Sequence, residues 1–432
     1  MRNTNTYLLP DSDFKNRLLK WSQRFPICSY LNSNENHYPS QDKSSFNCLA
    51  GVDAIEVFTA TKNSFDSLKS FYDQRKDWLF GFFSYDLKNE TEQLVSENPD
   101  YIAMPVIHFF IPRYVFEIAS DYVYIHHYCD TLEIQAVFDA INKEVIEEAG
   151  VNTPQPEVKK RVSQKDYLET VEKIKQHILK GDIYELNYCQ EFYVEEAIID
   201  AYRIYLQLNT LSPTPFSCFY KLNEKYLISA SPERFLKKTN DHLISQPIKG
   251  TIKRGHTIEE DEKLKNELRN SLKERSENIM IVDLVRNDLA RTARPGSVNV
   301  DELFGIYTFK QVHQMISTVS ATLSPEFHFI DAIKEAFPMG SMTGAPKINA
   351  MILIEKFEQT KRGLYSGAVG YINPQGDFDF NVVIRSILYN KNNNYLNFMV
   401  GSAITAESIV EKEYEECLVK AGALLKVLKG EI

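Results

Sequence analysis

The order of strand-like segments is the feature that most limits how this chain can fold. After residue 184 three apolar, β-rich segments follow one another, reading “ELNYCQEFYV”, “FSCFYKLN” and “KYLISASPERFLKKT”. A later stretch, “GLYSGAVGYINPQGDFDFNVVIRSILYN”, predicts a hairpin whose turn lies at residues 373–376. Helices do not alternate with these strands as they do in βαβ units. The pattern therefore predicts an α+β fold with large, mainly antiparallel sheets and helices packed outside.

A polar boundary divides the chain into two parts. The stretch “EEAGVNTPQPEVKKRVSQ” carries two prolines and predicts a linker or long loop near residues 147–163. Residues 1–150 are rich in short aromatic runs such as “WLFGFFSYDL”, which predict strands with a few connecting helices. Residues 160–432 carry the motifs described below. We expect the first part to belong to the sheet framework and the two parts to form one structural unit.

Three segments have the marks of helices. Ser163 is a candidate N-cap for the helix “SQKDYLETVEKIKQHILKG”, which ends at a glycine. Thr257 and Glu260 have capping-box spacing at the start of “HTIEEDEKLKNELRNSLKERSENIMIVDLVRNDLART”, and a change of register near “RSEN” predicts a possible break there. The stretch “AESIVEKEYEECLVKAGALLKVLKG” predicts a last helix that closes the chain.

Composition and charge exclude several classes of function. The chain of 432 residues is 43% hydrophobic and 25% charged, which is ordinary for a soluble globular protein. Its formal net charge of −10, with no long basic stretch, argues against a nucleic-acid or anionic-membrane partner. The six cysteines have no paired spacing, as expected of reduced thiols. The start lacks a signal-peptide pattern and no apolar run approaches the ~18 residues of a membrane span, so we expect a cytoplasmic protein.

Two predicted helices each carry a pair of glutamates three residues apart. These pairs are Glu274 with Glu277 in “KERSEN”, and Glu413 with Glu416 in “EKEYEEC”. At this spacing both carboxylates share one face of a helix, where like charges repel weakly. One interpretation is a solvated acidic face. The other is that the faces turn inward, as the apolar run after Glu277 suggests, and together bind Mg²⁺ through oxygen ligands.

Two further elements are suited to binding an anion. “FPMGSMTGAPKINAMILIEKF” predicts a glycine-rich loop that enters a helix near Pro346, where backbone N–H groups and the hydroxyls of Ser341 and Thr343 could donate hydrogen bonds. In the predicted hairpin, strand alternation places Arg385 on the polar face, where its guanidinium could bind a carboxylate. An ion pair between Arg385 and a neighbouring acid is the equally weighted alternative.

Six ordered motifs in this chain resemble those of the chorismate-utilising enzymes. They are “SASPERF”, “PIKGT”, “IVDLVRNDLAR”, “GSMTGAPK”, “GLYSGAVGY” with “VVIRS”, and “EYEECLVKA”. The resemblance covers the chain from about residue 165 to its end, and more loosely the earlier “GFFSYDL”. The family includes component I of anthranilate synthase and of aminodeoxychorismate synthase, together with isochorismate and salicylate synthases. It implies two large antiparallel sheets packed face to face, with helices outside and with Mg²⁺ and chorismate in a cleft.

The resemblance also implies roles for particular residues. Glu277 and Glu416 would hold Mg²⁺, and Glu274 and Glu413 would support its bound waters. Glu233 resembles the general acid that protonates the C4 hydroxyl of chorismate as it leaves. The remaining implied residues bind the two substrate carboxylates: Tyr365 and Arg385 the enolpyruvyl carboxylate, and Ser341, Thr251, Lys420 and the amides around Gly250 and Gly401 the ring carboxylate.

Lys249 distinguishes between branches of this family. Taken alone, it is most simply a strand-end lysine whose ammonium reaches solvent. However, “PIKGT” resembles the aminodeoxychorismate synthases, whereas anthranilate synthases resemble “PIAGT”. In the former the lysine amine is thought to attack C2 of chorismate before ammonia adds at C4. The attack needs a neutral amine; Lys253, Arg254 or Mg²⁺ could lower the pKa of Lys249, and Glu233 would oppose this.

Other positions depart from parts of the family pattern. Glu185 stands where isochorismate and salicylate synthases carry a water-activating lysine, so a water-adding reaction lacks its base. Gln314, next to His313, stands where a histidine linked to aromatisation is often found. Ala403 replaces a glycine beside the expected carboxylate site. The segment “YLNSN” near residue 30 replaces the tryptophan-binding segment of many relatives, so tryptophan feedback is not implied.

These resemblances lead to one preferred function and two alternatives. The preferred function is that of aminodeoxychorismate synthase component I, an amino-group transferase that supplies p-aminobenzoate and folate synthesis. The chain has no “GxCxG” nucleophile motif, so a separate glutamine amidotransferase subunit that delivers ammonia is the implied partner. The first alternative is anthranilate synthase component I. The second, from another class, is a non-catalytic scaffold subunit.

Overall fold

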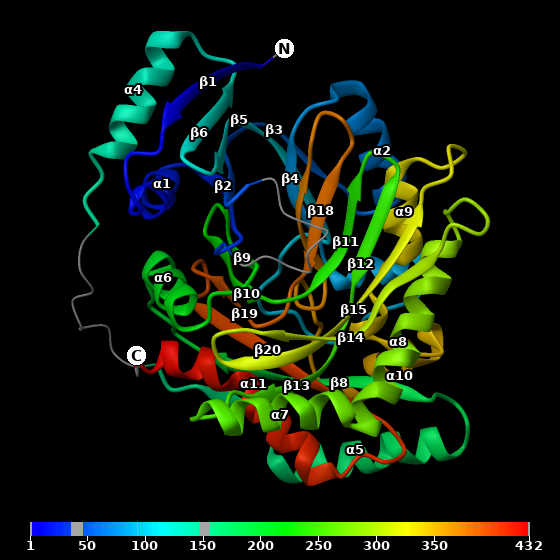
Figure 1. The fold of residues 1–432 in the computed structure, drawn as a ribbon. Helices are drawn as coiled ribbons and strands as arrows, with labels where there is room; N and C mark the ends of the chain where they lie inside the picture. The colour runs from blue at the N-terminus through cyan, green and yellow to red at the C-terminus, as the bar shows by residue number, and fades with distance from the viewer. Residues whose placement is uncertain (1, 36–45, 93, 147–155, 431–432) are drawn as a thin grey trace.

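The computed structural model describes residues 2–35, 46–92, 94–146 and 156–430. Every strand ladder among these residues is antiparallel, and the ladders join twenty strands into one continuous network. The long strand β5 (Ile107–Ala119) pairs along one edge with β3 (Cys48–Thr59) and along the other with β4 (Leu79–Phe83) and β6 (Tyr122–His127). The network therefore divides at β5 into two arms, which Figure 1 shows in ribbon form.

The first arm continues from β3 through strands taken from both ends of the sequence. In order, these are β2 (Ile27–Asn32), β9 (Phe216–Leu222), β10 (Lys225–Ser231), β19 (Ser386–Asn390), β20 (Tyr395–Ile404) and β8 (Glu185–Val194). At its far edge β8 also pairs with the two-residue strands β7 (Lys159–Lys160) and β16 (Gly344–Ala345), and β1 (Asn3–Leu8) pairs with β6 near the division.

The second arm continues from β4 and ends in the strand that carries “PIKGT”. In order, its strands are β17 (Ala368–Ile372), β18 (Phe378–Val382), β11 (Arg234–Thr239), β12 (His242–Gln246) and β15 (Val312–Thr322). The strand β15 then pairs with both β13 (Ile248–Lys253) and β14 (Asn299–Thr308). Strands from before residue 120 and after residue 180 are neighbours in both arms.

Three hydrophobic clusters define the layers of the molecule. One joins the facing sides of the two arms, through Phe80 and Val369 of one and Tyr220 and Leu388 of the other. The arms approach closely here, because a Cβ atom on Gly51 would lie 2.6 Å from the ring of Phe80. The other two clusters lie between the outer faces of the arms and the helices. The predicted α+β class, with mainly antiparallel sheets packed face to face and helices outside, is confirmed.

Different helices cover the two outer faces. The first arm is covered by α1 (Phe14–Ser22), α4 (Thr131–Asn142), α5 (Gln164–Leu179), α6 (Ala201–Leu211), α10 (Lys347–Phe357) and α11 (Val410–Leu428). The second arm is covered by α2 (Ser64–Arg75), α8 (Leu272–Ala290) and α9 (Phe329–Ala336). The helix α7 (Ile258–Asn270) packs near β13, and a short helix α3 (Lys88–Thr91) follows a 3-10 turn at Tyr85–Leu87. A second 3-10 turn lies at Gly340–Met342.

The predicted helix starts are confirmed, but the predicted helix break is displaced. The side chains of Ser163 and Thr257 accept hydrogen bonds from the backbone N–H groups of Asp166 and Glu260. The long helix splits at Ser271, which caps α8, and not near “RSEN”. The cause is local, since the Ser271 side chain accepts the N–H of Glu274 and so starts a new helix. Most of the predicted linker at residues 147–163 lies outside the described residues.

Arg385 does not lie in a strand, so the prediction that places it on the polar face of the hairpin by strand alternation is wrong. The strand β18 ends at Val382, and Arg385 has φ of +52°, so it belongs to the bend that leads into β19. The predicted turn at residues 373–376 is confirmed, with Gly376 at φ of +77°. Pro346 precedes the first residue of α10 as its N-cap.

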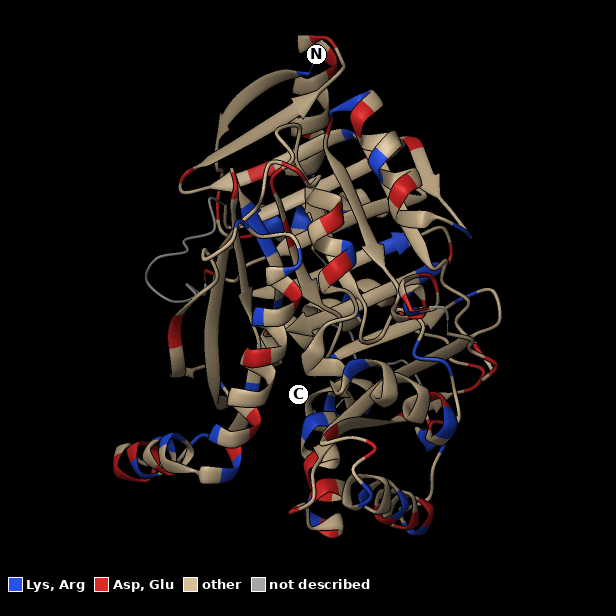
Figure 2. Cartoon of the chain, turned by 90° about the vertical axis from the view of Figure 1, so that its right-hand side faces the viewer, with Lys and Arg blue, Asp and Glu red and all other residues tan. Residues whose placement is uncertain are grey.

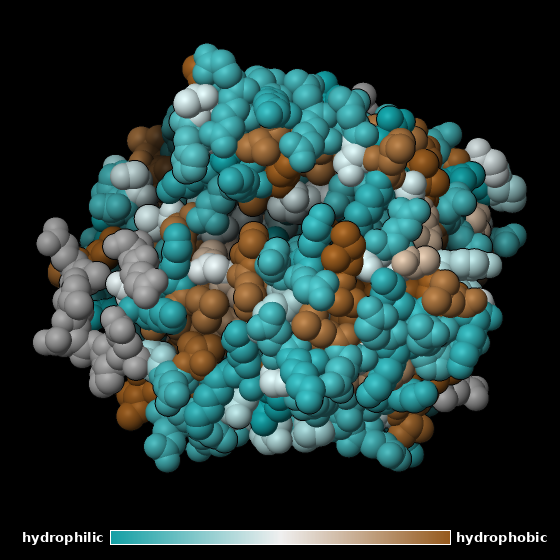
Figure 3. Space-filling model, turned by 90° about the horizontal axis from the view of Figure 1, so that it is seen from below, coloured by the Kyte–Doolittle hydropathy of each residue, from teal (hydrophilic) through white to brown (hydrophobic). Residues whose placement is uncertain are grey.

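The surface carries charges of both signs. Figure 2 shows Lys and Arg interspersed with Asp and Glu on the outer helices, while most strands are free of charged residues. The face in Figure 3 is largely hydrophilic, with separate small hydrophobic patches. Among the described helices, none has the length and apolar character that crossing a membrane requires.

Candidate active site

Twelve of the thirteen residues predicted to form the site line one pocket. The pocket lies where β13 and the start of α8, from the second arm, face β20 and α11, from the first. The residue outside the lining is Glu413, which is buried directly behind it and contacts Lys273 of the pocket wall. The structure therefore brings together motifs that are up to 187 residues apart, from Glu233 to Lys420.

A bulge in β13 directs Lys249 into this pocket. The register with β15 shifts between Ile248 and Thr251, and Gly250 has φ of +94°, a conformation that glycine adopts readily. A Cβ atom on Gly250 would lie 3.0 Å from a carboxylate oxygen of Glu274, so a larger residue would also have to displace the end of that side chain. Lys249 is only 8% exposed, which excludes the interpretation of a strand-end lysine in solvent.

Lys249 forms a buried ion pair with Glu185 of β8. Its Nζ atom donates a hydrogen bond to Oε1 of Glu185 at 2.5 Å, and the other oxygen of that carboxylate is buried without a hydrogen-bond partner in the described part of the chain. Burial lowers the pKa of Lys249, but Glu185, Glu277 and Glu233 outweigh this effect and raise it above its usual value. The expected lowering by nearby cations is therefore wrong for the protein alone, and Arg254 pairs instead with Asp261.

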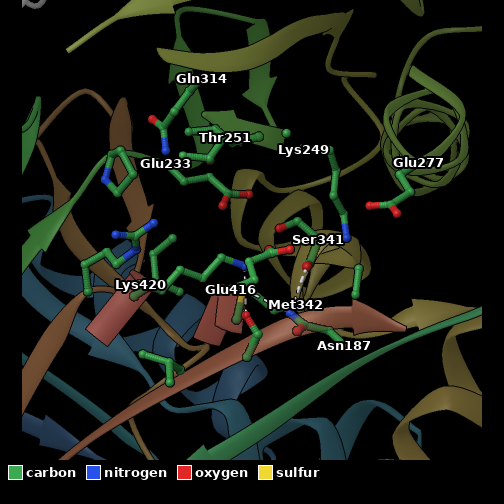
Figure 4. A pocket seen from close by; sticks show the side chains of 18 of the residues that line it. Asn187, Glu233, Lys249, Thr251, Glu277, Gln314, Ser341, Met342, Glu416 and Lys420 are labelled. Carbon is green, nitrogen blue, oxygen red and sulfur yellow. Dashed lines mark hydrogen bonds and ion pairs between the residues drawn. The ribbon is translucent and has the colours of Figure 1, made fainter. Parts of the chain in front are cut away.

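Glu233 has the properties of a general acid at neutral pH. It follows Pro232 between β10 and β11, lines the pocket and is 4% exposed. Burial raises its pKa to about 7, although a hydrogen bond with Ser341 and the charges of Lys249 and Lys420 oppose the increase. A carboxyl group that titrates near the working pH can both donate and accept a proton. Figure 4 shows this carboxyl group directed into the pocket, with Lys420 entering from the opposite side.

The four glutamates of the helical pairs are not a solvated acidic face. Glu277 and Glu413 are 6% and 1% exposed, and Glu274 and Glu416 are half-buried on the pocket wall. Burial raises the pKa of Glu277 to about 8, although Lys249 opposes the increase, and also raises the pKa of Glu274. Burial has the same tendency at Glu416, but Lys420, 2.7 Å away, outweighs it and lowers the pKa.

The residues at this end of the pocket fit a divalent cation. Within the described ranges no three His, Cys, Asp or Glu side chains gather closely enough to enclose a metal ion. However, Glu277 Oε1 and Glu413 Oε2 are buried and have no hydrogen-bond partner among the residues that the structure describes. Around the pocket as a whole, the carboxyl groups outnumber the cationic side chains by six to four, which leaves two surplus negative charges when all are ionised. The carboxyl groups are those of Glu185, Glu233, Glu274, Glu277, Glu413 and Glu416, and the cations are Lys249, Lys273, Lys420 and Arg385. Mg²⁺ usually takes one or two protein carboxylates and completes its shell with water and substrate.

The opposite end of the pocket presents groups that can bind carboxylates. Arg385 makes no ion pair with any described residue, which removes the alternative of a structural pair, and it lines the pocket beside Tyr365. Lys420 donates a hydrogen bond to the carbonyl of Gly401 at 2.8 Å and lies against Glu416. Ser341 and Thr251 complete this wall. These groups are suited to a ligand with two separate carboxylates.

Two expected anion-binding groups lie outside the pocket. The hydroxyl of Thr343 donates to the backbone carbonyls of Met339 and Gly340, and its side chain is fully buried. The start of α10 does not line the pocket, and Lys347 pairs there with Asp288. The glycine-rich loop thus contributes only Ser341 and Met342 to the pocket wall.

Of the residues that depart from the family pattern, Gln314 and Ala403 line the pocket and the others lie outside it. Gln314 lines the pocket with its Oε1 atom buried and, within the part of the chain described, unpaired. The neighbouring His313 points away and contacts Asp261 and Thr308. Ala403 lines the pocket. In “YLNSN”, the side chain of Asn34 is engaged in hydrogen bonds with residues near the start of β9.

Several residues of the site carry no signal in the sequence alone. Lys273 and Asn187 line the pocket. Behind them, Arg362 donates hydrogen bonds to the carbonyls of Met342 and Asn187 and forms a buried pair with Glu358. Their positions depend on how distant segments pack, so motif spacing does not reveal them.

Comparison with known proteins agrees with this geometry. Residues 26–426 match the chorismate binding enzyme family. The chain is 33% identical over 355 residues to aminodeoxychorismate synthase component 1 of Escherichia coli K12, covering 81% of this chain and 76% of that protein. It is 41% identical over 262 residues to anthranilate synthase component 1 of Bacillus subtilis 168, covering 61% of this chain and 50% of the relative. A probable chloroplastic aminodeoxychorismate synthase of rice is 40% identical over 270 residues, 62% of this chain.

The curated relatives differ in length, and solved structures share the fold. The chain spans 30% of the rice protein's length, so it corresponds to only a part of that protein. The crystal structure of anthranilate synthase component I from Streptococcus pneumoniae TIGR4 has a TM-score of 0.77 at 24% identity, covering 90% of this chain and 94% of that one. A menaquinone-specific isochorismate synthase from Escherichia coli has a TM-score of 0.80 at 16% identity, covering 99% and 94%. By its sequence match over nearly the whole length, this chain belongs to the chorismate-binding enzyme family.

Proposed function

We propose that this chain is the chorismate-converting component of an aminodeoxychorismate synthase, which makes 4-amino-4-deoxychorismate for p-aminobenzoate and folate synthesis. Relatives named for this activity and for anthranilate synthase match at 33% and 41% identity, so identity does not separate the two. The observation that carries the proposal is Lys249 of “PIKGT”, which is buried in the pocket that also holds Glu233. A lysine held there can act as a nucleophile, which the alanine of “PIAGT” cannot.

The first chemical step forms a bond between Lys249 and C2 of chorismate and releases the C4 hydroxyl. The Lys249 ammonium first passes a proton to Glu185, with which it shares a 2.5 Å hydrogen bond. The neutral amine then attacks C2, both ring double bonds shift (C1=C2 to C1=C6 and C5=C6 to C4=C5), and the C4–O bond breaks. Glu233 donates the proton with which the hydroxyl leaves as water. With its pKa of about 7, Glu233 retains that proton for part of the time at neutral pH.

The second step returns the enzyme to its starting state. Ammonia adds at C4, both double bonds shift back, and the C2–N bond to Lys249 breaks. The new ammonium group at C4 gives a proton to Glu233, and the departing lysine amine takes its proton back from Glu185, so all three groups regain their starting protonation. The sum of the two steps converts chorismate and ammonia into aminodeoxychorismate and water. The lysine thereby determines which carbon receives nitrogen, because its own attack at C2 blocks that position against ammonia.

Different residues of the pocket are proposed to bind the two carboxylates of chorismate and the Mg²⁺ ion. Arg385 and Tyr365 would bind the enolpyruvyl carboxylate, and Ser341, Thr251, Lys420 and the amides around Gly250 and Gly401 the ring carboxylate. Mg²⁺ would be held by Glu277 and Glu416, with Glu274 and Glu413 supporting its waters. When bound, the ion supplies positive charge to the ring carboxylate. The surplus negative charge around the pocket and the unpaired buried oxygens of Glu277 and Glu413 in the described part of the chain support that assignment.

A separate glutamine amidotransferase is the proposed source of ammonia. The “component 1” in the relatives' names supports a second component. All six cysteines of this chain are buried and none lines the pocket, so none is placed as the exposed nucleophile of a glutaminase. The absence of disulfides among these six cysteines is in keeping with the cytoplasmic location that we propose.

Product analysis tests the proposed function against its alternatives. The purified chain is incubated with chorismate, Mg²⁺ and ammonium, and the products are identified by mass. We expect aminodeoxychorismate, which keeps its enolpyruvyl group, so no pyruvate is released. Formation of anthranilate with one equivalent of pyruvate would instead identify an anthranilate synthase component. Unchanged chorismate under these conditions would support a scaffold subunit, and turnover with glutamine alone would overturn the proposed partner.

A further inference from the structure

Lys273 lies between the two acidic helix faces of the pocket. It stands in the first turn of α8 and lines the pocket. Its Nζ atom donates a hydrogen bond to Oε1 of Glu413 on α11 at 3.1 Å, and lies 3.8 Å from Oε1 of Glu277, one turn further along α8. A single ammonium group therefore bridges two carboxylates from different helices.

This ammonium only partly compensates the carboxylates around it. The side chains of Glu277 and Glu413 are 8% and 2% exposed. Oε1 of Glu277 lies beyond hydrogen-bond distance of Lys273, and Oε2 of Glu413 has no partner among the described residues. Buried carboxylate oxygens without partners are costly, so the cluster keeps the capacity to take more positive charge.

Lys273 is more exposed to solvent than the two acids that it contacts. Its side chain is 38% exposed, in contrast to the two acids that it contacts. A lysine side chain has four rotatable bonds and a strongly hydrated ammonium, so it can move toward solvent without losing a packed environment. The bridge thus consists of two buried acids and one partly exposed cation.

We propose that Lys273 is a resident counter-ion, which holds the acidic faces of α8 and α11 together in the metal-free protein and is displaced when Mg²⁺ binds. The inference rests on the proposed function, because the Mg²⁺ site at these carboxylates is part of that proposal. An ammonium group close to the same carboxylates repels a divalent cation, so both cannot hold them fully at once. The lysine would keep the two faces assembled while weakening the binding of the metal.

The test is the affinity for Mg²⁺ of the full chain without chorismate. Isothermal titration calorimetry with MgCl₂ compares the native protein with Lys273→Met, which keeps the length of the side chain and removes its charge. We expect Mg²⁺ to bind about tenfold more tightly to the variant, since the loss of one like charge close to the ion is worth at least ~1.4 kcal/mol. Lys273→Arg, which keeps the charge, should not gain affinity.

A matched control removes a lysine from a pair with the same spacing elsewhere. Lys165 on α5 lies 3.9 Å from Glu169, four residues along, and its side chain is 84% exposed. Lys165→Met changes the net charge of the protein as much as Lys273→Met does, but it should leave the Mg²⁺ affinity unchanged. A gain of similar size in the control would show that only overall charge matters and would overturn the inference.

The outcomes separate this inference from the proposed function. If native protein binds Mg²⁺ and Lys273→Met binds it no more tightly, Lys273 is not a competitor, while the proposed metal site stands. If neither protein binds Mg²⁺, the metal assignment fails and the inference fails with it. Melting temperatures give a second readout: in EDTA, Lys273→Met or Lys273→Gln should melt below native protein, and Mg²⁺ should raise their melting temperatures more. Equal increases would contradict the proposed exchange.

Discussion

Nζ of Lys249 lies 2.5 Å from Oε1 of Glu185, and both side chains are almost completely buried. The first residue comes from the bulged strand β13 of the second arm and the second from β8 of the first arm. The pair therefore spans the pocket between the two arms. It keeps the proposed nucleophile protonated in the resting protein and places a proton acceptor directly beside it.

Replacing Glu185 should lower the pKa of Lys249. Glu185 is the largest of the influences that raise this pKa, and burial acts in the opposite direction. In Glu185→Gln the lowering of the Lys249 pKa by burial is opposed by fewer negative charges. The neutral amine should therefore form at lower pH than in native protein. The measurement is acylation of Lys249 by an amine-directed reagent as a function of pH, followed by peptide mass spectrometry. As a control, Glu195→Gln removes an exposed partner of Lys159 and should leave the Lys249 profile unchanged. An unchanged or higher midpoint in Glu185→Gln would contradict the prediction.

Removing the amine of Lys249 should affect turnover far more than substrate binding. Lys249→Ala leaves Arg385, Tyr365 and the acidic residues in place, so we expect the KM for chorismate to change little and kcat to fall by about 100-fold or more. With chorismate and no ammonia, intact-protein mass spectrometry should detect an adduct on native protein and none on the variant. Lys238→Ala is the matched control, because Lys238 is equally buried but pairs with Asp377 away from the pocket. Native turnover to the same product in Lys249→Ala would rule out a covalent role.

The pocket could be predicted largely because its residues occur in short motifs. Glu277 and Glu416 were found from helical spacing, and the six ordered motifs led to Glu233 and Lys249. The contacts of these residues could not be predicted in the same way. The ion pair of Lys249 with Glu185 and the bridge from Lys273 to Glu413 join segments 64 and 140 residues apart. Only the tertiary packing of the arms brings them together.

The errors of prediction have local physical causes. Arg385 was placed by strand alternation, but the strand ends at Val382 and a positive φ turns the chain toward the pocket. Thr343 was expected to donate to an anion, but its hydroxyl is satisfied by backbone carbonyls of the preceding turn. Hydroxyl side chains often donate to nearby backbone carbonyls and are then not free to bind a ligand. The sequence alone does not show which of the two a hydroxyl will do.

Stability of the metal-free protein should fall as pH rises from about 5 to 8. The pKa of Glu233 is raised by burial from its ordinary value of 4.5 to about 7. Its contribution is therefore fully present below pH 4.5 and is lost as pH rises through about 7, an effect on the order of 3 kcal/mol. Guanidinium unfolding in EDTA at several pH values measures this slope. Glu233→Gln should reduce this slope, although Glu277 keeps part of it. Glu172→Gln, at an exposed position, should leave the slope unchanged, and an unchanged slope in Glu233→Gln would contradict the assignment.

Glu277 links stability to metal binding in the same pH range. Its buried carboxyl group, with a pKa of about 8, resists ionisation in the metal-free protein. Glu277→Gln should therefore preserve or increase stability in EDTA at pH 8, because a neutral amide replaces a group that is costly to ionise there. It should also weaken Mg²⁺ binding measured by calorimetry, since one ligand charge is lost. Full Mg²⁺ affinity in this variant would remove Glu277 from the proposed metal site.

The pair of Arg362 with Glu358 should be essential for both stability and the shape of the pocket. The two side chains are 1% and 2% exposed, and Arg362 also donates hydrogen bonds to the carbonyls of Met342 and Asn187. Arg362→Met leaves the buried Glu358 carboxylate without its cation, which should cost about 3–5 kcal/mol of unfolding free energy. Urea denaturation measures this loss.

The matched control for Arg362 is an exposed pair. Arg75 and Glu56 lie 2.7 Å apart with side chains 40% and 37% exposed, so Arg75→Met should cost less than about 1 kcal/mol. In the double variant Arg362→Met with Glu358→Met the unpaired charge is gone, and most of the stability should return. The carbonyls of Met342 and Asn187 still lack their donor, so the KM for chorismate should remain high although the fold is restored. Recovery of the native KM in the double variant would show that the pair supports only the fold and does not hold the pocket wall in place.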